Sequence, residues 1–194
     1  MARMATFDRD DALEAAMRLF WAKGYHATSL KDLEGVLAMR PGSIYAAFQS
    51  KEGLFRAAVD RYAARMEAEL RGLIAAAPQP LAALRQHLLG LAVLDPADRP
   101  STACMLVKSL LEVPRDGTLQ AFVIAHLDRI EDVLAEAIGR AVDLGELPPG
   151  SDRGRIARRI QTYIFGLKIQ AQRESDPQRM ADLCADLAEE LAHP

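Results

Sequence analysis

Residues 39–55 read MRPGSIYAAFQSKEGLF and carry several side chains that donate hydrogen bonds or bear positive charge, among them Arg40, Ser43, Tyr45 and Lys51. A hydroxyl at the tip of a tyrosine ring, a serine hydroxyl and an ammonium at the start of a helix all suit phosphate oxygens. The guanidinium of Arg40 suits either a phosphate or the edge of a guanine. This pattern predicts a surface that contacts a nucleic acid.

The same segment has unusually small residues on the expected outer face of its helix. Gly42 lets the backbone approach a ligand closely, and Ala46 and Ala47 can touch thymine methyl groups without blocking entry to a groove. Pro41 fits the first position of a helix, because its missing N–H would have no partner there. We therefore predict a helix over residues 41–48 whose outer face enters the major groove of DNA.

Two of these residues also have a purely structural interpretation. Tyr45 could pack against Phe48 and Phe20, since tyrosine is often half-buried. Lys51, taken alone, is usually a solvated charge. The prediction of DNA contact depends on both residues occurring in register with one helical pattern.

Three short helices are expected to build this part of the chain. Apolar residues from Leu13 to Phe20 recur with helical spacing, which predicts a first helix over residues 8–23, ended by Gly24. Thr28 or Ser29 then caps a second helix. The inner face of that second helix is predicted to consist of Leu30, Leu33, Val36 and Leu37, and the third helix is the one over residues 41–48.

Longer helices follow. Ser50 is expected to cap a fourth helix over residues 51–76, and further helices are predicted at 79–94, 102–113, 117–144, 152–174 and 177–192, separated by breaks rich in Pro, Gly, Asp and Ser. No segment alternates as a strand would over more than a few residues. The sequence predicts an all-α fold of about nine helices. These helices divide into a small N-terminal part, residues 1–50, and a larger part, residues 51–194, with helix 51–76 linking the two.

The composition limits the class of protein. Of 194 residues, 50% are hydrophobic and only 6% are aromatic, which favours helices over strands. The net charge of −3 argues against indiscriminate nucleic-acid binding. No apolar run reaches the roughly 18 residues that span a bilayer, and no signal peptide is recognisable, so we expect a soluble cytoplasmic protein without a membrane partner. Cys104 and Cys184 are too few for a disulfide framework.

Residues 12–62 resemble the TetR family of bacterial transcriptional regulators. The motifs that carry the resemblance are LFWAKGYHATSLKDL, GSIYAAF and SKEGLF, in this order and at these separations. The resemblance implies a helix-turn-helix DNA-binding domain over residues 1–50 and an effector-binding and dimerisation domain over residues 51–194. It also implies a double-stranded DNA operator as the partner, and repression as the default mode of regulation. The predicted DNA contacts are Thr28, Ser29, Arg40, Pro41, Gly42, Ser43, Tyr45, Ala46 and Lys51.

The chain departs from the family pattern at several positions. Ala38 stands where the turn usually carries a glycine, so the turn must form without the most permissive residue. Arg40 replaces the usual small capping residue before the third helix. Ala46 and Ala47 replace an aromatic residue or histidine, which removes hydrogen-bonding capacity and leaves the operator sequence unpredicted. Trp21 is expected to pack in the core or at the interface between domains.

The last two helices are candidates for a dimer interface, because one short recognition helix reads too few base pairs for useful specificity. The resemblance implies a four-helix contact between two copies of the chain. The predicted interface residues are Ile160, Ile164, Leu167, Leu183, Leu187 and Leu191. The alternative is that these apolar faces are buried within one subunit.

The resemblance also implies that the middle helices enclose a pocket for a small-molecule effector. The candidate pocket residues are His87, Leu91, Cys104, Met105, Lys108, Leu110, Phe122, His126, Tyr163 and Phe165. The apolar members could equally be plain core, and His87 and His126 could simply be half-exposed. Cys104 lies near a helix N-terminus, where a thiol can be reactive, although a buried and inert cysteine is the alternative.

Two rival functions need to be considered. An enzyme is disfavoured because the sequence contains no GxSxG, HExxH, P-loop or GxGxxG motif, and the four histidines have no metal-ligand spacing. We therefore expect no catalytic residue, metal or cofactor. The second rival is a helical ligand-binding or interaction protein that has lost DNA binding, at which Ala38, Ala46 and Ala47 hint.

Overall fold

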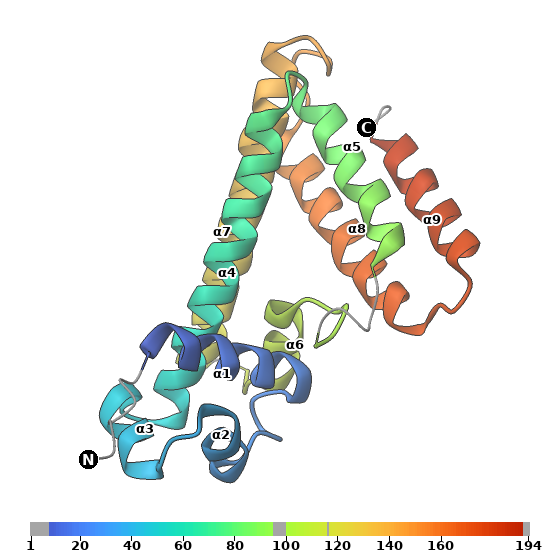
Figure 1. The fold of residues 1–194 in the computed structure, drawn as a ribbon. Helices are drawn as coiled ribbons and strands as arrows, with labels where there is room; N and C mark the ends of the chain where they lie inside the picture. Colours follow the sequence, from blue (N-terminus) through green and yellow to red (C-terminus); the bar gives the residue numbers. More distant parts are fainter. Residues whose placement is uncertain (1–7, 95–99, 116, 192–194) are drawn as a thin grey trace.

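The computed structural model describes residues 8–94, 100–115 and 117–191, and within these ranges the chain forms nine α-helices, one 3₁₀ turn and no strand (Figure 1). The helices are α1 (Arg9–Lys23), α2 (Leu30–Leu37), α3 (Pro41–Phe48), α4 (Lys51–Ala76), α5 (Pro80–Gly90), α6 (Met105–Glu112), α7 (Thr118–Asp143), α8 (Arg153–Arg173) and α9 (Pro177–Glu190); the 3₁₀ turn is η1 (Leu91–Val93). The predicted all-α fold is confirmed. None of the helices in the described ranges is long and apolar enough to cross a bilayer.

The ends of the N-terminal helices are set by local capping. Gly24 ends α1 with φ +89°, a conformation that side-chain-bearing residues rarely adopt. Ser29 caps α2, because its hydroxyl accepts from the N–H of Asp32 while the Asp32 carboxylate accepts from the N–H of Ser29. The hydroxyl of Ser50 accepts from the N–H of Gly53 and begins α4. Predicted boundaries in this region therefore agree with the structure.

Two apolar cores lie along the long helices α4 and α7, which run side by side (Figure 1). The N-terminal core joins α1, α2, α3 and the first half of α4 to α6 and the start of α7, and its buried residues include Phe20, Ile44 and Leu106. The C-terminal core joins the second half of α4 to α5, α7, α8 and α9. Residues from α6 and α7 complete the N-terminal core.

The turn between α2 and α3 is built on Ala38. This residue has φ 51° and ψ 35°, the left-handed conformation in which Cβ is close to the following carbonyl. The turn therefore has the backbone geometry that a glycine would favour, and Ala38 adopts it with some steric strain. The residue is exposed, so nothing packs on its methyl group to offset that cost.

Ala38→Gly is expected to stabilise the protein. Glycine adopts the left-handed conformation without the steric cost, although its greater freedom in the unfolded chain removes part of the gain. The net increase in the free energy of unfolding should be about 0.5–1 kcal/mol, measured by urea denaturation. Ala64→Gly, in the exposed interior of α4, is a matched control that should lower it by a similar amount. A destabilising Ala38→Gly would contradict the assigned strain.

Candidate nucleic-acid interface

The polar and small side chains of α3 lie on its solvent-exposed face. Ile44 and Phe48 are buried at 1% and 5% relative exposure and anchor α3 on the N-terminal core. Tyr45, one residue after Ile44, is 43% exposed despite its size, so it does not pack into the core. Gly42, Ser43 and Ala46 are exposed on the same helix, and Pro41 occupies its first position. The outer face of α3 thus consists of small residues around one projecting hydroxyl.

Two basic residues flank this face. Arg40 is exposed and precedes α3 without any side-chain capping bond, so its guanidinium is not used to close the helix. Lys51 is the first residue of α4, and its ammonium lies 4.6 Å from the centre of the Tyr25 ring. Partial burial lowers the pKa of Lys51, opposed by the carboxylates of Asp32 and Glu112. The aromatic ring positions this charge at a helix N-terminus, where anions are already favoured.

The structure corrects one predicted DNA contact. Thr28 is fully buried, and its hydroxyl donates to the carbonyl oxygen of Gly24 at 2.6 Å, so it closes the turn after α1 and cannot reach a ligand. The prediction left the capping role open between Thr28 and Ser29, and Ser29 is the residue that fills it. Ser29 remains exposed, but its hydroxyl also donates to Asp32.

An unexpected set of contacts fixes α6 to the turn between α1 and α2. The carboxylate of Glu112 accepts from the N–H of Tyr25 at 2.6 Å, and the backbone oxygen of Glu112 lies 2.9 Å from Nε2 of His26. Lys108 donates to the carbonyl oxygen of Trp21 at 2.6 Å, and thereby caps the end of α1. No pattern within α6 reveals these bonds, because their partners lie more than 80 residues away in the sequence.

Glu112→Ala should destabilise the junction between α6 and the helix-turn-helix. The half-buried N–H of Tyr25 would lose its carboxylate acceptor, at a cost of about 1–3 kcal/mol. Glu112→Gln keeps a carbonyl acceptor and should lose less than half of that amount. Thermal unfolding of the two variants beside the wild type measures the difference. Equal melting temperatures for Glu112→Ala and the wild type would show that water replaces the carboxylate without loss.

Comparisons with known proteins agree with this arrangement of helices. Residues 12–58 match the family of bacterial regulatory proteins of the tetR type, and residues 80–193 match the C-terminal domain of BetI-type transcriptional repressors. The second match alone covers more than half of the chain. The protein belongs to the TetR family.

Individual relatives of this TetR-family chain are regulators along their whole length. The HTH-type transcriptional repressor ComR of Escherichia coli is 29% identical over 183 residues, which is 93% of this chain and 87% of ComR. A cysteine variant of the TetR-family regulator CifR, solved with a 26-base-pair operator DNA, superposes with a TM-score of 0.86 at 28% identity, over 97% of this chain and 98% of that one. The fold and the relatives are those of transcriptional regulators and not of enzymes.

A cavity of about 290 Å³ lies between α4, α5, α7 and α8 of the TetR-family chain. His87 and Phe165 line it, as predicted, together with apolar residues of α4 such as Leu70 and Leu73. Burial, and to a lesser extent the charge of Lys168, lowers the pKa of His87 to about 4, so the imidazole is neutral at pH 7. The cavity therefore has apolar walls and a few polar groups, as ligand sites generally do.

The structure places most other predicted pocket residues elsewhere. Leu91 is buried in the C-terminal core, and Cys104 and Met105 are buried in the N-terminal core, where Leu110 also packs. Lys108 is taken up by its bond to the end of α1. These five residues have apolar or hydrogen-bonded surroundings of their own, which the spacing within one helix could not reveal. For Cys104 the buried alternative holds.

The structure places three further predicted pocket residues outside this cavity. His126 is buried with Nε2 2.9 Å from Asp60, and Phe122 packs edge-on against the His126 ring, so both belong to the α4–α7 contact. The hydroxyl of Tyr163 donates to Glu190 on the outer side of α8 and α9, away from the cavity. Trp21, for which core or domain-interface packing was expected, packs against the N-terminal core, and its Nε1 donates to the carbonyl oxygen of Ala103 at 2.7 Å.

The predicted dimer residues need a similar correction. Ile160, Ile164, Leu167 and Leu191 are at most 5% exposed and fill the C-terminal core of a single chain. Buried side chains have no surface left for a partner, so for these four the alternative of burial within one subunit holds. Leu183 and Leu187 are only partly buried against that core. The predicted apolar stripe of α8 is present, and it packs against α7 of the same chain.

Proposed function

We propose that this TetR-family protein is a cytoplasmic repressor that binds a pseudo-palindromic DNA operator as a homodimer and is released by a small molecule. The single observation that carries the proposal is the outer face of α3. Its side chains are small except for Tyr45, and the basic Arg40 and Lys51 stand at its two ends. The operator-bound state of the related CifR supports this assignment.

The geometry of α3 suits the major groove of B-DNA, which is about 12 Å wide and admits one helix. In our proposal Gly42 and Ala46 face the base edges, and the hydroxyl of Tyr45 donates to a phosphate oxygen. Lys51 adds its charge to the positive end of α4 at a second phosphate. Arg40, exposed and free of any capping role, reads either a phosphate or a guanine.

The dimer surface that we propose is the outer side of α8 and α9. Ile169 is 49% exposed on α8, and Gly166 and Thr162, three and seven residues before it, are exposed on the same side. The half-buried Leu183 and Leu187 of α9 complete this proposed surface. The hydrogen bond from Tyr163 to Glu190 joins α8 and α9 at the edge of the surface. Two copies joined here would present their α3 helices to successive major grooves, about 34 Å apart.

The cavity between α4, α5, α7 and α8 is the effector site in this proposal. A ligand releases the operator when it binds more tightly to a dimer whose α3 helices are wrongly spaced. The bonds from Glu112 and Lys108 to the end of α1 support such coupling, because they tie the helix-turn-helix to the ligand-binding part. The long helix α4 takes part in both cores and provides the second connection.

Fluorescence anisotropy with a labelled duplex from upstream of the protein's own gene tests the proposal. We expect one dimer to bind each site with a dissociation constant on the order of 10⁻⁸ M or lower. The affinity should fall steeply as the salt concentration rises. A scrambled duplex should bind at least a thousandfold more weakly. A monomer in analytical ultracentrifugation, or equal affinity for both duplexes, would contradict the proposal.

A further inference from the structure

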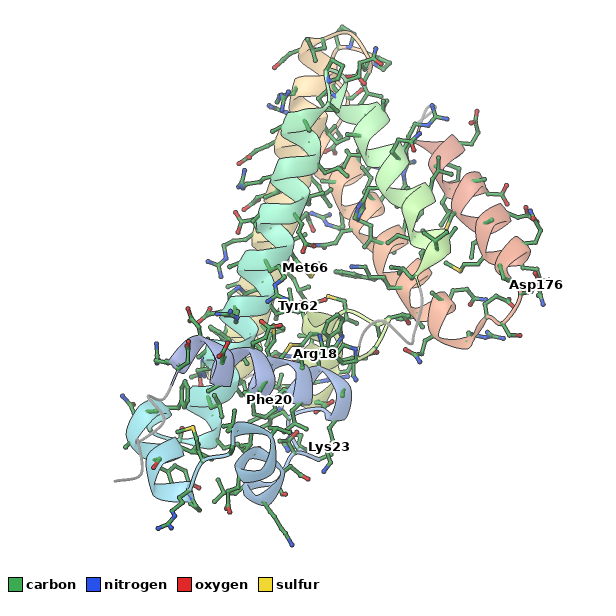
Figure 2. All side chains as sticks on the ribbon, in the orientation of Figure 1. Arg18, Phe20, Lys23, Tyr62, Met66 and Asp176 are labelled. Carbon is green, nitrogen blue, oxygen red and sulfur yellow. The ribbon has the colours of Figure 1, made fainter. Side chains whose placement is uncertain are left out.

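A second cavity adjoins the effector cavity on the side of the DNA-binding helices. It has a volume of about 250 Å³ and shares Met66, Glu69 and Lys168 with the first. Arg18 and Trp21 of α1 form its other side. In Figure 2, Arg18 on α1 lies below Tyr62 and Met66, which follow each other upward along α4. A long ligand could therefore reach from the effector cavity to the first helix of the helix-turn-helix.

The two cavities differ in chemistry. The walls of the first are mostly apolar, with Leu70, Leu73, Ile130 and Ile164 among the residues that line it. The second is mostly polar and is lined by three basic residues against one acidic residue. The basic residues are Arg18, Arg65 and Lys168, and the acidic residue is Glu69.

The basic residues of the second cavity are not equivalent. Arg65 is held by the carboxylate of Glu14 in α1, which neutralises it. Arg18 is exposed and makes no ion pair within the described part of the chain. A ligand group in this cavity would meet an excess of positive charge. The guanidinium N–H groups of Arg18 are the ones available to donate hydrogen bonds to it.

We propose that the two cavities together bind an elongated amphipathic anion. Its apolar tail fills the space between α4, α7 and α8, and its carboxylate lies beside Arg18 of α1. Lys168, at the junction of the cavities, contributes positive charge, and the neutral His87 lies near it. This inference rests on the proposed function, because it names the chemical class of the effector.

In this arrangement the effector would directly contact α1, the first helix of the DNA-binding part. A carboxylate bound by Arg18 would connect α1 to α8 through the ligand, since Lys168 belongs to α8 and lines both cavities. A ligand that bridges two parts of a protein favours the conformation in which the bridge fits. The position of α1, and with it that of α3, would then depend on ligand binding.

Trp21 provides a built-in probe, because it is the only tryptophan of the chain and lines the second cavity. Titration of the full-length protein without DNA should use decanoate and decylammonium below their micellar concentrations and decanol below its solubility limit. We expect a saturable change of tryptophan fluorescence with decanoate, at least tenfold weaker binding of decanol, and still weaker binding of decylammonium. Equal binding of the three, or preference for the cation, would overturn the proposal.

Variants separate the head group from the tail. Arg18→Gln should weaken decanoate binding about fivefold and leave decanol unchanged. Arg140→Gln, at an exposed position in the last turn of α7, is the matched control and should change neither. Ile164→Phe, which fills the first cavity, should weaken both ligands. Unchanged decanoate binding in Arg18→Gln would refute the assigned head-group position.

The ligand-binding experiment and the operator-binding experiment can fail independently of each other. Operator binding is measured without amphiphile, so a protein that binds its operator but not decanoate disproves only this inference. A protein that binds decanoate with the predicted selectivity but binds no operator disproves the proposed function and supports the ligand class.

Discussion

Replacing Tyr45 by Phe and Lys51 by Ala together should lower operator affinity about a hundredfold. Each protomer of the proposed dimer loses one hydroxyl bond and one charged contact to phosphate, and four such losses of about 0.7 kcal/mol each amount to about 3 kcal/mol. Because phosphate contacts carry no sequence information, affinity for a scrambled duplex should fall in the same proportion. Loss of Lys51 from both protomers should also reduce the salt slope by about 2.

Both substitutions leave the fold largely intact, since Tyr45 is exposed and Lys51 lies at the surface end of α4. Circular dichroism should therefore show a melting temperature close to that of the wild type. Arg140→Ala, which removes an exposed basic side chain from the last turn of α7, is the control and should bind the operator normally. Unaltered affinity of the double variant would remove Tyr45 and Lys51 from the interface.

Gly53→Ala should unfold the junction between α3 and α4. A Cβ at this position would lie 2.2 Å from the backbone oxygen of Phe48, far inside van der Waals contact. That oxygen belongs to the backbone at the end of α3, so it cannot move aside as a side chain would. We expect the free energy of unfolding to fall by about 3 kcal/mol, measured by urea denaturation.

The same helix contains a matched control. Gly72 is exposed, and a Cβ added there would meet no atom within 4 Å. Gly72→Ala should therefore stabilise α4 by about 1 kcal/mol, because alanine is the better helix former. The two substitutions are chemically identical, so opposite signs would isolate the contact with Phe48. A Gly53→Ala variant as stable as the wild type would show that α3 can shift freely on α4.

Local patterns in the sequence determined the helices of the DNA-binding part. Pro41 and Ser50 fixed the starts of α3 and α4, and Gly24 fixed the end of α1, since capping depends on atoms only a few residues apart. The spacing of Ile44 and Phe48 puts both on one face of α3, whereas the structure decided that Tyr45 points outward and does not pack on Phe48 and Phe20. The family resemblance rested on the same stretch of chain.

Only the tertiary structure decided which surface covers each apolar face. The stripe of Ile160 and Leu167 on α8 was visible in the sequence, but a stripe does not say whether its partner is the same chain or another copy. The bond from Glu112 to Tyr25 and the adjoining cavities beside Arg18 likewise depend on contacts between distant segments. Helical periodicity reports how one helix is divided into faces, whereas the neighbour of each face is set by the packing of all the helices together.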